Sequence, residues 1–183
     1  MLCYPSRWTK NAVLKSGVEV FLRPELSDDT EMLWEMFSTL SKESLEYLIH
    51  PFTRERIEGW TDNINYNKHL PMLAIIREND KERIIATASL SFNSRESIRH
   101  KAELAITVHD DYQNQGLGTI MVRHLLEIAE EKRLKKIFLR VDTKNSRAIH
   151  VYEKCGFTIE AKLEKEDYVK GHFKDDYRMA YFL

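Results

Sequence analysis

The chain has 183 residues, of which 43% are hydrophobic and 31% charged, a balance typical of one globular domain. Its 28 lysines and arginines against 29 aspartates and glutamates give a net charge of −1, which argues against nucleic acid as a direct partner. No run of about eighteen apolar residues could span a membrane, and the start lacks the apolar core of a signal peptide, so a cytoplasmic protein is expected. Cys3 and Cys155 are far apart in sequence and predict neither a disulfide framework nor a metal site.

The first forty residues predict a strand followed by a helix. Residues 13–24 contain two short extended pieces around the turn-forming pair Ser16-Gly17 and are expected to supply a first strand at a sheet edge. Residues 27–29 offer side chains that can cap a helix of about twelve residues. That helix is expected to bury one apolar stripe, made of Met32, Leu33, Met36, Phe37 and Leu40.

Two shorter helices and a central sheet are expected next. One helix should begin near Ser41 and end at Pro51, and another should begin at Thr53, with apolar positions at Ile57, Trp60 and Ile64. Extended segments are expected at 72–76, 84–92, 103–108, 137–141, from 157 onward and at 177–183. Together these elements predict an α/β (α+β) fold in one domain over residues 1–183. Its sheet is expected to be mixed and mostly antiparallel, with about seven strands flanked by four or more helices.

A glycine turn at 113–118 joins the strand at 103–108 to a long helix. The helix has one apolar face, formed by Leu117, Ile120, Met121, Leu125, Ile128 and Ala129. A strand that feeds through such a turn into a helix leaves backbone N–H groups unpaired at the positive end of the helix dipole, which suits a phosphate. The spacing is neither the dinucleotide fingerprint, which would need glycine in place of Met121, nor a P-loop, because Thr119 and Ile120 follow Gly118.

A second segment, residues 145–157, predicts a short capped helix. Asn145 suits the N-cap position, and Gly156 suits the stop before a strand that begins at Phe157. Ala148, Val151 and Tyr152 should share one helical face.

The two segments together resemble the GCN5-related N-acetyltransferase (GNAT) superfamily. Gln-x-x-Gly-x-Gly at 113–118 is similar to its pyrophosphate-binding turn, and 145–157 matches its N-x-x-A-x-x-x-Y-x-K-x-G-F pattern. The resemblance implies acetyl-CoA as cosubstrate and no metal. It also implies that the coenzyme contacts Ile106, Thr107, Val108, Gln113, Asn114, Gln115, Gly116, Leu117, Gly118, Thr119, Asn145, Ala148 and Tyr152.

A closer resemblance concerns the acceptor of the acetyl group. Tyr4-Pro5, 13–17, 22–24, 40–44 and 64–67 are similar to the acetyltransferase domain of Pat-type protein lysine acetyltransferases, but residues 45–52 depart from that pattern. The resemblance implies a protein lysine as acceptor. A small amine such as a polyamine, amino acid or antibiotic is the alternative, a non-catalytic acyl-CoA sensor is a third reading, and the protein is expected to be a monomer or a homodimer.

The chemistry needs groups that move protons. A lysine amine has an ordinary pKa of about 10.4 and must lose a proton before it attacks. The resemblance implies Glu103 as general base, directly or through water, and Tyr152 as the acid that protonates the departing thiolate. His109, on the same alternate face as Glu103, is the reserve base. A backbone N–H near 105–108, where two parallel strands splay apart in the superfamily, is expected to bind the thioester carbonyl.

Three further features have plainer interpretations. Cys155 has no histidine partner placed by any motif, so a covalent acetyl-cysteine route is not expected. The basic run at 132–136 suits the C-terminal end of a helix. The mixed charges between Glu160 and Asp176 predict a solvated hairpin beside the acceptor entrance.

Overall fold

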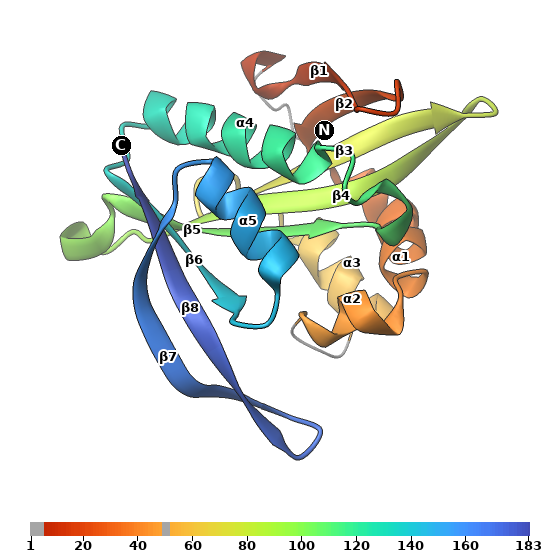
Figure 1. The fold of residues 1–183 in the computed structure, drawn as a ribbon. Coiled ribbons are helices and arrows are strands. Elements are labelled where there is room, and N and C mark those ends of the chain that lie inside the picture. The colour runs from red at the N-terminus through yellow and green to blue at the C-terminus, as the bar shows by residue number, and fades with distance from the viewer. Residues whose placement is uncertain (1–5, 49–51) are drawn as a thin grey trace.

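The computed structural model describes residues 6–48 and 52–183, which form one eight-stranded sheet covered by helices (Figure 1). The strands are β1 (Lys10–Val13), β2 (Glu19–Pro24), β3 (His69–Glu78), β4 (Lys81–Phe92), β5 (Lys101–Val108), β6 (Lys136–Asp142), β7 (Thr158–Val169) and β8 (His172–Phe182). The helices are α1 (Thr30–Ser38), α2 (Lys42–Glu46), α3 (Arg54–Asp62), α4 (Leu117–Glu131) and α5 (Ser146–Lys154). The strand order is β1-β2-β3-β4-β5-β6-β8-β7, and only β5 and β6 run parallel.

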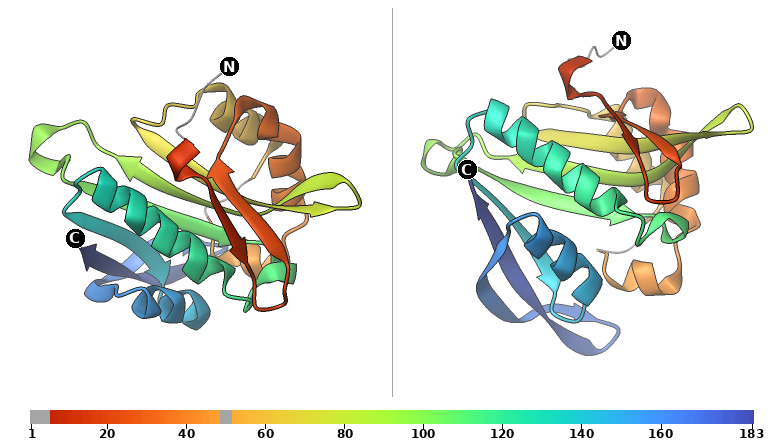
Figure 2. Two further views of the ribbon diagram at one scale, coloured as in Figure 1. Left: turned by 90° about the horizontal axis from the view of Figure 1, so that it is seen from above. Right: turned by 45° about the horizontal axis from the view of Figure 1, so that its top comes forward.

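Two apolar clusters place the sheet between layers of helices (Figure 2). On one face α4 buries Leu117, Met121 and Leu125 against β3, β4 and β5, with α5 beside it. On the other face α1 and α3 cover Leu73 and Ile75 of β3. Side chains alternate between the two faces along each strand. In β4 and β5 most of the apolar side chains point towards α4, and the more polar side chains that alternate with them point to the opposite face.

The predicted first strand is in fact two strands, which is why the sheet has eight and not seven. Gly17 has φ +89, a left-handed conformation that favours glycine, and the turn around it lets β1 fold back on β2. The Leu14 N–H donates to the Val18 carbonyl across this turn at 2.9 Å. The predicted place at a sheet edge is confirmed, because β1 is the outermost strand.

The first predicted helix is shorter than expected, and its capping side chain has another role. Asp29 makes no side-chain cap; it accepts two bonds from the Arg23 guanidinium at 2.6 Å each and one from the Leu26 N–H at 2.7 Å. The third helix ends at Asp62, before Ile64. Ser41 and Thr53 do cap α2 and α3.

Some expectations cannot be compared with the structure. Cys3, Tyr4-Pro5 and Pro51 lie outside the described residues. No helix in the described part of the chain is both long and apolar enough to cross a membrane.

The parallel pair at the centre of the sheet separates. β5 and β6 pair from Lys101 with Lys136 as far as Glu103 with Phe138, and no further. Beyond that point β5 stays with β4 as far as Val108, while β6 stays with β8 as far as Asp142 (Figure 1). The expected splay of two parallel strands is confirmed, and it opens the sheet next to residues 104–108.

Candidate active site

A cavity of about 1370 Å³ follows the opening between β5 and β6. Residues 103–108 line it from β5 and residues 140–142 from β6. On the α4 face it is lined by the glycine turn and by α5, and on the opposite face by residues of α1, α2 and α3. One continuous space therefore joins the two faces of the sheet through the separated strands.

The glycine turn presents an open helix N-terminus to this cavity. Gly116 is the N-cap of α4 with φ +90, and no side chain caps the helix. The first N–H groups of a helix have no partner within it, so those of α4 are available to an anion. A Cβ on Gly118 would meet Val151 at 3.6 Å, an ordinary contact, so the protein itself leaves room there.

Most residues predicted to contact the coenzyme line the cavity. They are Ile106, Thr107, Val108, Gln113, Asn114, Gly116, Gly118, Thr119, Asn145, Ala148 and Tyr152. Two do not. The Leu117 side chain is buried in the core, and the Gln115 side chain bonds to Ser16 and, at 2.9 Å, to the Asp111 carbonyl. Leu117 and Gln115 can contribute to coenzyme binding only through their backbone groups, because their side chains pack or bond against other parts of the protein.

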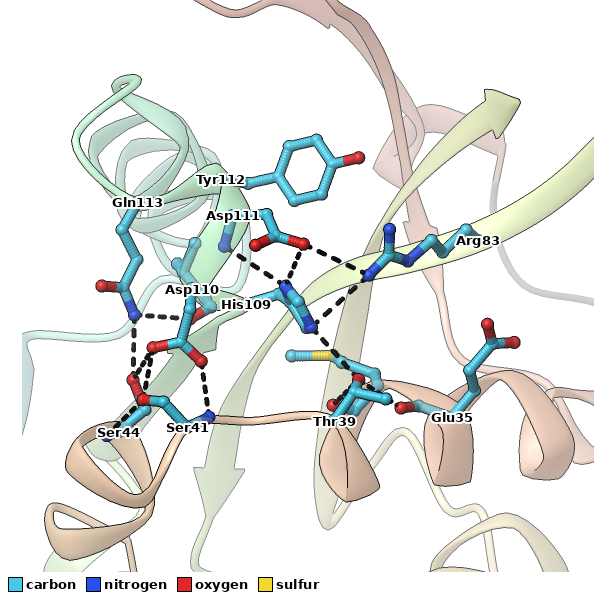
Figure 3. A network of polar contacts seen from close by, with 12 residues as sticks. Glu35, Thr39, Ser41, Ser44, Arg83, His109, Asp110, Asp111, Tyr112 and Gln113 are labelled. Atoms are coloured by element: carbon cyan, nitrogen blue, oxygen red, sulfur yellow. Dashed lines mark hydrogen bonds and ion pairs between the residues drawn. The ribbon is translucent and has the colours of Figure 1, made fainter. Parts of the chain in front are cut away.

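A polar network fixes the turn to the start of α2 (Figure 3). Asp110 accepts bonds from the Ser41 N–H at 2.8 Å and from the hydroxyls of Ser41 and Ser44 at 2.7 and 2.6 Å. Gln113 donates to the Ser44 hydroxyl at 3.1 Å and to the Val108 carbonyl at 3.0 Å. Burial alone would raise the pKa of Asp110, but these hydrogen bonds outweigh it and hold the pKa below its usual value.

His109 belongs to the same network and does not line the cavity. Its side chain is 5% exposed, with Nε2 at 3.1 Å from the Thr39 hydroxyl and Nδ1 accepting from the Asp111 N–H at 3.3 Å (Figure 3). Although its sequence position shares the alternation of Glu103, β5 ends at Val108 and the ring turns towards α1. The reserve role as a base is therefore wrong on geometry.

Tyr152 reaches the cavity from α5. Asn145 caps that helix through a bond from the Ala148 N–H at 3.1 Å, as expected. Tyr152 is 6% exposed, lines the cavity and packs against Phe157. Burial raises the pKa of its hydroxyl, so the group keeps its proton at neutral pH.

Glu103 lies on the opposite face, where β5 and β6 part. Its carboxylate is 3.9 Å from the Arg140 guanidinium, which also binds Glu166 at 2.7 Å. The Glu103 side chain is 44% exposed, so water and an acceptor can reach it. Glu103 and Tyr152 line one cavity from the two sides of the opening, as an acid and a base on opposite sides of a transfer would.

Cys155 lies away from this cavity. Its side chain is largely buried, its sulfur lies 4.0 Å from the Thr119 carbonyl, and it lines a separate, smaller pocket. Burial raises the pKa of its thiol, which disfavours the nucleophilic thiolate.

The predicted hairpin between Glu160 and Asp176 is confirmed as β7–β8, and it lines the cavity on the face of Glu103. Lys174 donates to the Glu46 carbonyl of α2 at 2.7 Å and pairs with Asp142 at 3.2 Å. Lys170 lies 3.7 Å from the Glu46 carboxylate. These contacts tie the hairpin to α2 across the cavity.

Sequence patterns missed several residues of the cavity wall. Lys15, Glu25, Phe37, Arg56 and Trp60 come from segments distant in sequence. Helical spacing marks Phe37 and Trp60 only as packing positions, and no spacing signal marks the other three. Only the pairing of β2 with β3 and the packing of α1 and α3 bring them to one place.

Comparison with known proteins identifies the relatives of the chain. Residues 31–157 match the model of the Acetyltransferase (GNAT) family. Spermidine N(1)-acetyltransferase of Escherichia coli K12 is 33% identical over 86 residues, 46% of this chain and 46% of that enzyme. The enzyme of the same name from Vibrio cholerae is 29% identical over 119 residues, 62% of this chain and 67% of the relative. The chain thus aligns with less than half of the E. coli enzyme.

Among solved structures, the GNAT domain of S. lividans PAT superposes with a TM-score of 0.78. It covers 99% of this chain and 100% of that domain, at 22% sequence identity. An identity this low shows a shared fold only. The fold expected from the Pat-type resemblance is confirmed, whereas the spermidine enzymes are closer in sequence over the regions that align.

Proposed function

The chain belongs to the acetyltransferase (GNAT) family, and from this premise we propose that it transfers the acetyl group of acetyl-CoA to the primary amine of a small molecule. The observation that carries the proposal is the single cavity that runs from the uncapped start of α4, between β5 and β6, to Glu103. This cavity can hold a coenzyme on one face of the sheet and an acceptor on the other.

The residues present suit the coenzyme. The open N–H groups from Gly116 onward are oriented for a pyrophosphate, and the unpaired edge of β5 after Glu103 offers N–H and carbonyl groups to an extended chain with amide bonds. An acyl carbonyl beside residues 105–108 would accept a hydrogen bond from that same edge. Binding through backbone groups makes small residues in the turn necessary.

Glu103 and Tyr152 would move the two protons of the reaction. Glu103, directly or through one water, takes the proton that the acceptor ammonium must lose. The amine nitrogen then forms a bond to the thioester carbon, the carbon–sulfur bond breaks, and the nitrogen releases its second proton to solvent. Tyr152 gives its proton to the departing sulfur and regains one from solvent. Every proton and electron pair is accounted for without a covalent intermediate on the protein.

A small acceptor is favoured over a protein lysine by two observations. The hairpin and α2 are joined across the acceptor half through Lys174 and Glu46, which restricts the access of a folded protein surface. The aligned curated relatives from E. coli and V. cholerae are spermidine acetyltransferases by name. The structural similarity to the GNAT domain of S. lividans PAT, at 22% identity, shows a shared fold and does not support a protein lysine as acceptor.

The test is a transfer assay with a panel of acceptors. Free coenzyme thiol would be measured after incubating the protein with acetyl-CoA and, separately, spermidine, putrescine, single amino acids and a lysine-containing peptide. Turnover with a free amine at a rate well above that with the peptide is expected. Tight binding of acetyl-CoA with no turnover of any acceptor would contradict the proposal and favour an acyl-CoA sensor.

A further inference from the structure

Glu25 is a buried carboxylate that faces the acceptor half of the cavity. It follows β2, where its N–H donates to the Pro71 carbonyl at 3.0 Å and its own carbonyl accepts a bond from the Tyr66 hydroxyl at 2.6 Å. The backbone is thus fixed on both sides. The residue is 3% exposed, and it lines the cavity.

No described residue pairs with this carboxylate. Within residues 6–48 and 52–183, its oxygens have neither a hydrogen bond nor an ion pair. The nearby cation, Arg23, directs two bonds at Asp29 and a third at the Pro24 carbonyl. Buried acidic groups are ordinarily paired, because an unpaired buried charge is costly. Glu25 therefore presents to the cavity a carboxylate that no described residue pairs with.

The floor between Glu25 and Glu103 is made of small residues. Glu25 adjoins Pro71, which is paired with Ser89, and Ser89 is paired with Ala105, so these positions form one row across the sheet. Thr87 and Thr107 form the neighbouring row on the same face. Small side chains leave room above the sheet for a flexible chain lying across the strands.

The two carboxylates stand at opposite ends of this floor. Three strand spacings separate β2 from β5, and Glu103 lies two residues along β5 from Ala105, so the two backbones are roughly 16 Å apart. Both side chains project over the same face of the sheet. An extended aliphatic chain with an amine at each end suits that gap and satisfies both groups.

We propose that Glu25 is a specificity-determining residue that binds the remote ammonium of an aliphatic diamine or polyamine while Glu103 serves the amine that is acetylated. This inference rests on the proposed acetyltransferase function and narrows its acceptor class. A protein lysine offers one ammonium and leaves Glu25 without a partner. A diamine supplies the missing charge.

Binding of an ammonium should be linked to the ionisation of Glu25. Burial, followed by the charge of Asp29, raises the pKa of Glu25 to about 7, while Arg23 acts in the opposite direction. The carboxyl is therefore partly protonated at neutral pH and pairs with an ammonium better as the pH rises. His69 also lines the cavity and bonds to the Ser91 hydroxyl at 2.8 Å. Its own titration would affect the wild type and Glu25→Gln alike, so the effect of Glu25 is the difference in pH dependence between these two proteins.

The experiment compares Glu25→Gln with the wild type on putrescine and on butylamine, which differ only in the remote amine. We expect Glu25→Gln to raise KM for putrescine by about 10- to 100-fold, the scale for removing one partner of a buried ion pair. KM for butylamine and for acetyl-CoA should stay within a factor of about two. The wild-type KM for putrescine should fall as pH rises through about 7, and this change should be absent in Glu25→Gln.

Glu19→Gln provides the matched control, because Glu19 is an exposed carboxylate at the other end of β2. Equal KM values for putrescine in the wild type and Glu25→Gln, with both proteins active, would overturn the role of Glu25 and leave the proposed acetyltransferase function standing. If neither amine is acetylated, the proposed function fails. Calorimetric titration of putrescine into the wild type and Glu25→Gln, each saturated with CoA, then decides whether Glu25 binds an ammonium, and equal affinities would refute it.

Discussion

Replacing Glu25 with glutamine should stabilise the folded chain at pH 8 while weakening recognition of the acceptor. Glutamine has nearly the same shape and carries no charge, so it can occupy the buried position without the cost of ionisation. Functional carboxylates held in unfavourable surroundings commonly show this exchange of stability for activity. The expected gain follows from the pKa of the group.

The magnitude comes from the rise in pKa from 4.5 to about 7 in the folded state. Because the folded-state pKa lies above the ordinary value, the unfolded chain loses this proton first as the pH rises, and the folded state loses stability between pH 4.5 and about 7. At about 1.4 kcal/mol for each pH unit, the loss reaches about 3 kcal/mol above pH 7. Below pH 4.5 both states are protonated and the group has no such effect.

The assay is urea unfolding of the wild type and Glu25→Gln at pH 5, 6, 7 and 8 and constant ionic strength, followed by tryptophan fluorescence. The advantage of the variant in free energy of unfolding should be small at pH 5, rise to about 3 kcal/mol and level off near pH 8. Glu19→Gln should show no comparable growth, because that side chain is exposed. A difference between Glu25→Gln and wild type that is constant from pH 5 to 8 would refute the reasoning.

Two further substitutions test the coenzyme site and the chemical route. Gly118→Val should abolish acetyl-CoA binding in a calorimetric titration, because side-chain bulk in the first turn of α4 obstructs approach of the pyrophosphate to the N–H groups. The control Gly59→Val, in α3, should bind acetyl-CoA normally. Unchanged affinity of Gly118→Val would show that the coenzyme does not bind at this turn. Cys155→Ala should keep most of its activity, because the sulfur lies outside the main cavity, and a stoichiometric acetyl-cysteine found by mass spectrometry would contradict direct transfer.

Sequence patterns predicted those parts of the site that depend on residues close together in the chain. The glycine turn, the cap at Asn145 and the apolar face of α4 each depend on residues a few positions apart, and the structure confirms them. The splay of β5 and β6 followed from the family resemblance. The roles of Glu103 and Tyr152, the cytoplasmic location and the oligomeric state stay predictions.

Other features depend on contacts between distant segments. Glu25 is buried because β2 pairs with β3 and helices cover that face, and nothing near it in sequence signals a cavity. Leu117 was predicted both for the apolar face of its helix and as a coenzyme contact, and its buried side chain fits the first prediction. His109 was misplaced because strand alternation was extended one residue past the end of β5. Asp29 was expected to cap a helix, whereas Arg23, six residues earlier, takes its carboxylate.

The most direct test of the central claim is a pH–rate profile of acetyl transfer to putrescine by the wild type and Glu103→Gln, at saturating acetyl-CoA. The account predicts that the variant binds acetyl-CoA normally and transfers about 10²–10⁴-fold more slowly at neutral pH, the scale of a positioned base. The deficit should shrink as the pH approaches the pKa of the amine, because a neutral amine needs no base. Equal rates for the two proteins across that range, or no transfer by the wild type, would contradict the account.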